Sequence, residues 1–290
     1  MTRVLSALVL LPVVIGTIWF LGGTGTFVLA VTAAVLAFSE YRMIARALGA
    51  DVPAVTGGAL VILVCYAMWI TDRASDTVGF EGHLILTPNV VYLVLMAALI
   101  VVGATAISRG RPAPSVLSDA AATVFAGVYL GLPLGALAAT RGDNGAGFPR
   151  GLIWDATDGR LILLLLMAVI VVSDSAQYYT GRAFGRRPLA PTISPKKTVE
   201  GAVGGVVFGT LAMSLGGHFL FESPIWILVL VGAAISLLGI VGDLFESLLK
   251  RSAGVKDSSN LIPGHGGVLD RIDSWLFAAP VYYVFVRFIA

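Results

Sequence analysis

Long apolar runs separated by short polar segments make up most of this chain. A run of about 20 apolar residues is long enough to cross a bilayer as a helix. Such runs lie at Val4–Phe20, Thr26–Leu48, Val55–Ile70, Leu84–Ile107, Val116–Ala139, Leu161–Tyr179, Val199–Phe221, Ile225–Leu249 and Ile272–Ile289. The pattern predicts an all-α polytopic integral membrane protein with about nine transmembrane helices.

Composition agrees with this fold class. Of the 290 residues, 57% are apolar and only 12% are charged, whereas soluble domains carry roughly 25% charged residues. The single cysteine, Cys65, excludes an intrachain disulfide and a cysteine-based metal site. We expect the lipid bilayer as a partner and no nucleic acid.

The first two apolar runs have unusual ends. Arg3 precedes the first run, as in a signal peptide, but the length of that run and the further runs behind it favour an uncleaved helix. The second run is apolar only as far as Phe38 and continues as the amphipathic segment Glu40–Arg46. This pattern predicts that the end of the second helix lies along the membrane interface.

The basic residues are distributed asymmetrically. A cytoplasmic N-terminus would leave only five of the 19 Lys and Arg residues outside, namely Arg73, Arg141, Arg150, Arg160 and Arg287. Because basic residues concentrate on the cytoplasmic side, we expect the N-terminus and the active site in the cytoplasm and the C-terminus outside. Thr71–His83 and Thr140–Arg160 are then external connecting loops. The abundance of Ala, Gly and Val hints at a GC-rich bacterium and therefore at the inner (plasma) membrane.

Polar chemistry concentrates in the second half of the chain. The first half has Asp119 as its main intramembrane acid, whereas polar residues become frequent after Ser173. We therefore expect residues 1–160 to be scaffold helices and residues 161–290 to be the catalytic half, within one membrane domain. No internal repeat of the kind seen in many transporters is evident.

The stretch Gly242–Ser274 carries most of the ionisable residues. A helix over Ile240–Arg251 would align Asp243, Ser247 and Lys250 on one face. The following segment Gly254–Gly267 is predicted to be an irregular loop, after which Asp270 and Asp273 share a face at the start of the next helix. Asp270 and Asp273 could simply be acids that interact favourably with the dipole at a helix N-terminus. Taken together, however, ionisable groups that each cost roughly 2.5–3.5 kcal/mol at membrane depth indicate a functional site.

The residue types indicate phosphate chemistry. Asp243, Asp270 and Asp273 are hard oxygen donors that suit Mg²⁺, which completes its shell with water and substrate phosphates. Cationic side chains accompany them, namely Lys196, Lys197, Lys250, Arg251 and Lys256. Such a site performs phosphoryl-type transfer by positioning and charge neutralisation. His265 could contact a phosphate, transfer a proton or hold its glycine-rich loop.

Two segments upstream extend this candidate site. Ser194 followed by Pro195 predicts a helix start, with Lys196 and Lys197 in its first turn, where they would bind phosphate or be attracted to anionic lipid. Asp174 interrupts an apolar run and could line the site or belong to a polar helix end that meets lipid headgroups. The stripe of Gly201, Gly205 and Gly209 predicts close helix packing.

These residues resemble the phosphatidate cytidylyltransferase (CDP-diacylglycerol synthase) family, whose signature has the form S-x-x-K-R-x4-K-D-x-x-x-x-[LI]-P-x-H-G-G-x-x-D-R-x-D. The segment SPKKT and the following Glu200-Gly201 also resemble that family, and the likeness covers roughly residues 170–275. The matching positions of the signature are Ser247, Lys250, Arg251, Lys256, Asp257, Ile262, Pro263, His265, Gly266, Gly267, Asp270, Arg271 and Asp273.

The resemblance implies transfer of the cytidylyl group of CTP to phosphatidic acid, giving CDP-diacylglycerol and pyrophosphate in phospholipid biosynthesis. It implies Mg²⁺, held by Asp243 and Asp270 with support from Asp273; more than one ion, an additional monovalent cation and a homodimer are compatible with it. The catalytic residues would be Asp243, Ser247, Lys250, Arg251, Asp270 and Asp273. The substrate-binding residues would be Asp174, Ser194, Lys196, Lys197, Thr198, Lys256, His265 and Arg271.

Two alternatives remain at this point. A CDP-alcohol phosphotransferase would use related chemistry, but its D-G-x-x-A-R…G-x-x-x-D-x-x-x-D pattern is absent. A cation-coupled transporter would also place charges in membrane helices, and substrate-stimulated ion flux without nucleotide turnover would identify it.

Overall fold

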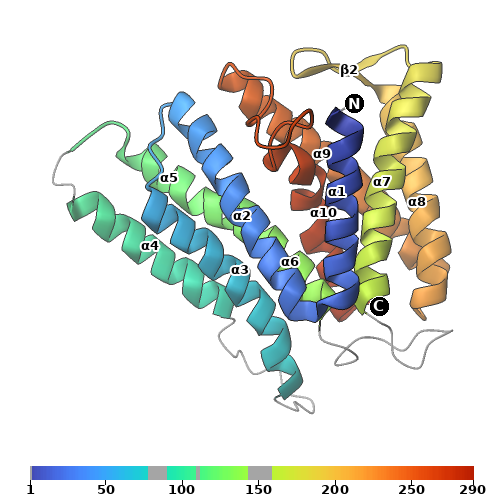
Figure 1. The fold of residues 1–290 in the computed structure, drawn as a ribbon, viewed down its shortest axis with the longest axis horizontal. Helices are drawn as coiled ribbons and strands as arrows, with labels where there is room; N and C mark the ends of the chain where they lie inside the picture. Colours follow the sequence, from blue (N-terminus) through green and yellow to red (C-terminus); the bar gives the residue numbers. More distant parts are fainter. Residues whose placement is uncertain (1, 78–89, 109–111, 143–158) are drawn as a thin grey trace. The chain divides into compact units, whose positions relative to one another are not determined.

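The computed structural model describes residues 2–77, 90–108, 112–142 and 159–290. Most of this part is helical (Figure 1). The elements are α1 (Thr2–Phe20), α2 (Gly22–Ala47), α3 (Ala54–Thr77), α4 (Val90–Ser108), α5 (Val116–Ala126), the π-helical turn η1 (Gly127–Gly131), α6 (Leu132–Arg141), α7 (Gly159–Phe184), β1 (Pro188–Ala190), β2 (Ser194–Thr198), α8 (Val199–Leu220), α9 (Ile225–Ser252) and α10 (Leu269–Phe288).

The all-α membrane fold predicted from the hydropathy pattern is confirmed. Among the described residues, 7 helical segments are long and apolar enough to cross a membrane. They are α2, Ala54–Thr71 of α3, α4, the continuous segment from α5 to α6, α7, α8 and α9. The first and last predicted runs coincide with α1 and α10, which are not among these segments, so the count of about nine is not confirmed.

Large apolar side chains are exposed along several of these helices. On α4 they include Tyr92, Met96 and Ile100, and on α8 they include Val203 and Leu215. A soluble protein rarely exposes apolar patches of this extent, whereas lipid-facing helices require them. The chain is therefore a multi-pass membrane protein.

The chain divides into two compact units. Unit 1 comprises Met1–Gly142 and Ser252–Leu269, and unit 2 comprises Asp143–Arg251 and Asp270–Ala290. The chain thus leaves unit 2 at the end of α9, contributes residues 252–269 to unit 1 and returns to unit 2 within the first turn of α10. The predicted scaffold and catalytic halves remain expectations, although the 252–269 segment of the expected catalytic half belongs to unit 1.

Unit 1 is built around α3, which packs against α2, α4, η1 and α6. Gly131 and Gly135 permit close approach, because a Cβ on either would lie 2.6 Å from a backbone carbonyl of α3. Arg141 ends α6 and is buried, and its Nε donates to the Ile18 carbonyl at 2.9 Å. Of the predicted external loops, residues 78–83 and 143–158 lie outside the described part.

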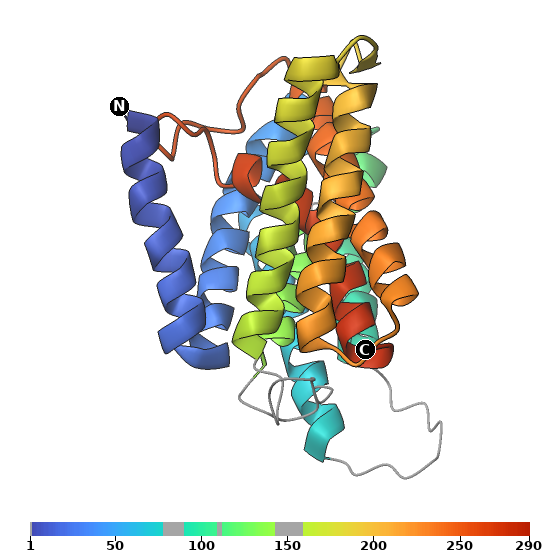
Figure 2. The same ribbon diagram turned by 90° about the vertical axis from the view of Figure 1, so that its right-hand side faces the viewer.

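Unit 2 contains the closely packed pair α7 and α8, shown in yellow-green and light orange in Figure 2. The predicted small-residue stripe lies in this contact. A Cβ on Gly201 would lie 2.7 Å from the Gln177 carbonyl, and one on Gly205 would lie 3.1 Å from the Ser173 carbonyl. The glycines therefore allow the two helix backbones to meet, as the sequence predicted.

The prediction of a helix beginning at Ser194 is wrong. Ser194–Thr198 forms β2, which pairs antiparallel with β1, and α8 begins at Val199. The actual N-cap is Thr198, whose Oγ1 accepts the Gly201 N–H at 3.1 Å. Ser194 and Thr198 are both favourable N-cap residues. The second is used because pairing with β1 holds the intervening residues extended.

The end of the second predicted helix, expected along the membrane interface, belongs to one long helix in which Glu40 is buried. The helix α2 continues without a break to Ala47, and Glu40 is only 1% exposed. Its carboxylate bonds with the segment 252–269 of the same unit. That segment is irregular, as predicted, with an isolated bridge between Ile262 and Gly266 and positive φ at Gly264 and Gly266.

Candidate active site

One cluster in unit 2 joins the hairpin to α9. Lys197, on β2, forms an ion pair with Asp243 of α9, and the Ser247 hydroxyl donates to Asp243 Oδ1 at 3.4 Å. Asp243 and Ser247 therefore share a helix face, as predicted. Glu200 fixes the base of the hairpin, because its Oε2 accepts the N–H groups of Arg186 at 2.9 Å and Arg187 at 3.2 Å.

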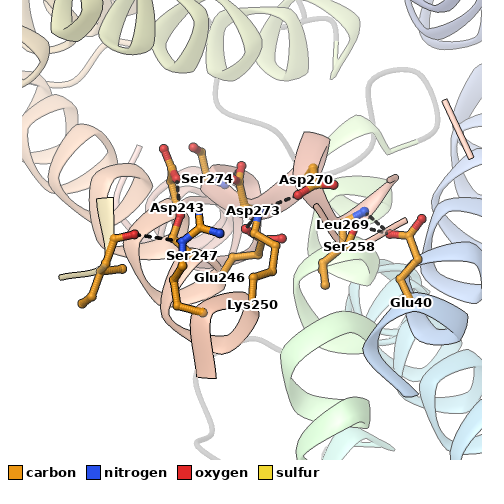
Figure 3. A network of polar contacts seen from close by, with 12 residues as sticks. Glu40, Asp243, Glu246, Ser247, Lys250, Ser258, Leu269, Asp270, Asp273 and Ser274 are labelled. Atoms are coloured by element: carbon orange, nitrogen blue, oxygen red, sulfur yellow. Dashed lines mark hydrogen bonds and ion pairs between the residues drawn. The ribbon is translucent and has the colours of Figure 1, made fainter. Parts of the chain in front are cut away.

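A second cluster joins α9 to α10. The Lys250 ammonium pairs with both Glu246 and Asp270, and the three side chains are 9%, 0% and 5% exposed (Figure 3). Lys250 thus contacts Glu246 on its own helix, and its contact with Asp270 links it to the next helix. Glu246 was missed, although an acid four residues before a lysine in an apolar helix is a recognisable signal.

Gly242 brings α9 against α10. A Cβ at this position would overlap the Asp273 carbonyl oxygen and lie 3.1 Å from the Phe277 ring, so only glycine permits the contact. Asp243 is therefore held beside the first turns of α10. The carboxylate of Asp273 interacts electrostatically with Asp243 and Asp174, while its Oδ1 accepts the Ser274 N–H at 2.7 Å. Three acids from α7, α9 and α10 thus gather in unit 2.

The remaining candidates occupy several places. In unit 2, Arg251 at the end of α9 donates to the Ile193 carbonyl at 3.4 Å, which ties that helix to the hairpin turn. Lys196 and Arg271 are exposed, and Ser194 is half-buried. Lys256 is exposed and His265 half-buried on the 252–269 segment of unit 1.

The carboxylates of unit 2 match the donor type expected for Mg²⁺, but they are not arranged as a finished metal site. Within the described part of the chain, no three His, Cys, Asp or Glu side chains are grouped closely enough to hold an ion. Asp243 and Asp270 are each paired with a lysine. Since Mg²⁺ takes only one or two carboxylates when substrate phosphates supply further oxygens, this donor set still fits the ion.

Comparison with known proteins agrees with the motif. The model of the cytidylyltransferase family matches residues 1–289. The chain belongs to the cytidylyltransferase family. Two relatives that match this chain over almost its whole length are named phosphatidate cytidylyltransferase. The one from Staphylococcus haemolyticus is 30% identical over 97% of this chain and 95% of its own length. The one from Brucella suis is 30% identical over 98% of this chain and 92% of its own length.

Other relatives match a shorter region of the chain at higher identity. The uncharacterized protein YnbB of Escherichia coli is 45% identical over 130 residues, which is 45% of this chain and 44% of that protein. The chain thus spans less than half the length of YnbB in that match. The phosphatidate cytidylyltransferase of Synechocystis is 47% identical over a region of the same size.

Proposed function

We propose that this protein transfers the cytidylyl group of CTP to phosphatidic acid, forming CDP-diacylglycerol and pyrophosphate. The observation that carries the proposal is relatedness over almost the whole chain to proteins named phosphatidate cytidylyltransferase. The paired lysines and aspartates of unit 2 support it, because they supply the charges that a nucleotidyl transfer needs.

In this reaction an oxygen of the phosphatidate phosphate attacks the α-phosphorus of CTP. The bond from that phosphorus to the oxygen bridging the β-phosphate breaks, and pyrophosphate leaves with the electron pair. A phosphate monoester is already largely ionised near neutral pH, so no strong general base is required. Lys196, Lys197, Lys250 and Arg251 bind phosphate oxygens and stabilise the charge that develops on them. Ser194, Thr198, Lys256, His265 and Arg271 are proposed to bind substrate.

Asp243 and Asp270 are the proposed Mg²⁺ ligands, with Asp273 in support, and Asp174 lies in the same electrostatic cluster as Asp243 and Asp273. When bound, the ion neutralises negative charge on the phosphates. Lys197 and Lys250 already balance Asp243 and Asp270. These two ammonium groups therefore hold the two carboxylates in place until the nucleotide arrives.

The assay is incorporation of radiolabelled CTP into lipid by the purified protein in detergent, with phosphatidic acid and Mg²⁺. Labelled CDP-lipid is expected, and it should disappear when the divalent cation is chelated. Asp270→Asn should lower the rate by about 100-fold, because it removes one proposed ligand and one of the two acids that pair with Lys250. A folded wild-type protein that makes no CDP-lipid across several metals and acyl chains would refute the proposal and favour the transporter alternative.

We further propose that the N-terminus and the active site face the cytoplasm and that the C-terminus lies outside. Thr192, in the hairpin turn, and Glu222, between α8 and α9, are both exposed and stand at opposite ends of α8. Cysteines placed at these positions form a matched pair, because the native Cys65 is fully buried. A membrane-impermeant maleimide applied to intact cells should label Glu222→Cys and not Thr192→Cys. The reverse pattern would invert the topology.

A further inference from the structure

Glu40 is a buried acid in the middle of unit 1. Its side chain lies on α2 and is only 1% exposed. A buried carboxylate is costly unless it is fully paired or hydrogen-bonded. Its partners come from more than 200 residues further along the chain, in the 252–269 segment that carries half of the sequence motif (Figure 3).

The Glu40 carboxylate accepts four hydrogen bonds. Oε2 accepts from the Ser258 hydroxyl at 2.9 Å and the Leu269 N–H at 2.7 Å. Oε1 accepts from the Ser259 hydroxyl at 2.6 Å and the Val268 N–H at 2.9 Å. Each oxygen thus accepts two hydrogen bonds, which fills the acceptor capacity of a carboxylate.

Two of these donors belong to the start of α10. Leu269 is the first residue of this helix and Val268 precedes it. The first N–H groups of a helix have no partner within the helix, and a carboxylate is a favourable acceptor for them. Glu40 therefore caps α10 from another helix. The next residue after Leu269 is Asp270, and Asp273 lies less than one turn further on.

The segment is shaped around this carboxylate. A Cβ at Gly267 would overlap both the Ser258 hydroxyl and the Glu40 carboxylate, so the contact requires glycine. The hydroxyls of Ser258 and Ser259 hold the preceding turn to the same group. The carboxylate thus holds the segment on both sides of the His265-Gly266-Gly267 sequence.

We propose that Glu40 is a positioning residue for the reaction: it holds the 252–269 segment and the first turn of α10 and thereby orients the carboxylates of Asp270 and Asp273. This inference rests on the proposed cytidylyl transfer for its kinetic readout. In this proposal Glu40 acts through the backbone that it holds.

The test is the variant Glu40→Gln in the full-length protein. An amide replaces one carboxylate oxygen with NH₂, which would then face a serine hydroxyl and a backbone N–H. The hydroxyl can rotate and accept, but the N–H cannot, so one end of the contact is lost. We expect kcat to fall about 10- to 100-fold, as for other groups that orient ligands, while KM for CTP changes far less.

Asp119→Asn is the matched control. Asp119 is also a carboxylate of unit 1 that accepts a backbone N–H, from Asp51 at 2.8 Å, and a hydroxyl, from Ser115 at 3.2 Å. It makes these bonds away from the motif-bearing segment, so kcat should stay near that of the wild type.

A second readout does not depend on turnover. Hydrogen exchange in detergent should quicken in Glu40→Gln within residues 253–270 and remain unchanged in α3 and α8. Faster exchange there with wild-type kcat, or unchanged exchange there, would overturn the proposal. If Glu40→Gln loses protection from exchange throughout the protein, the milder variant Ser259→Ala replaces it, because this variant removes only one donor to Glu40. Ser259→Ala must then show faster exchange confined to residues 253–270 and a smaller fall in kcat, or the proposal fails. An inactive wild type would refute the proposed function, while exchange would still report whether Glu40 holds the segment.

Discussion

Replacing Asp243 with asparagine is expected to lower the rate of CDP-diacylglycerol formation by about 100-fold or more. The substitution keeps the size and shape of the side chain but removes its charge. The asparagine carries no charge, so the ion pair with Lys197 is lost and the proposed Mg²⁺ loses a charged ligand. Because its side chain is 30% exposed, the fold should tolerate the change. Initial rates with saturating CTP and phosphatidic acid measure the effect.

Glu222→Gln is the control for this experiment. It makes the same chemical change in the same unit, at an exposed position in the turn that precedes α9. Its rate should match that of the wild type. An Asp243→Asn protein that elutes as a single folded species and retains more than half of the wild-type rate would remove Asp243 from the proposed site.

Local patterns predicted α9 and its polar face because helical periodicity is a property of neighbouring residues. The order of Asp243, Ser247 and Lys250 fixes their common face once the segment is helical. The irregular segment before α10 was equally readable from its glycines and Pro263. In both places, local preference and tertiary structure agree.

The start of α8 could not be read in the same way. Ser194-Pro195 and Thr198 are both plausible helix starts, and the choice between them depends on β1 pairing with β2. As a result, Lys197 lies on a strand and pairs with Asp243 of α9. A helix that began at Ser194 would instead have directed the backbone N–H groups of its first turn at an anion.

Glu246 and the capping contacts of Glu40 were both missed. Glu246 lies beside other charged residues of α9, and Glu40 lies in a segment that also carries Arg42 and Arg46. Glu246 pairs with a lysine one turn away. Glu40 instead bonds with a segment more than 200 residues later, a contact that only the folded chain creates. A single ionisable residue at membrane depth therefore indicates a specific polar contact in the folded protein, even when no motif surrounds it.

Lys250→Met should destabilise the protein strongly, because a single ammonium serves two acids. Glu246 and Asp270 are 0% and 5% exposed, and the substitution leaves both carboxylates without this partner. Removing one member of a buried ion pair typically costs about 3–5 kcal/mol, since the remaining charge stays buried. Methionine has a similar length, so little packing is lost. Thermal unfolding in detergent, followed by the loss of helical circular dichroism, measures the difference.

Two companion variants separate charge from size. Lys196→Met changes an exposed lysine in the same way and should shift stability by less than about 1 kcal/mol. The double variant Lys250→Met with Glu246→Gln removes one of the two stranded charges and should recover part of the loss. If Lys250→Met unfolds at the wild-type temperature, the lysine does not balance the two acids. If the double variant is less stable than the single one, Glu246 contributes through a contact other than its pairing with Lys250.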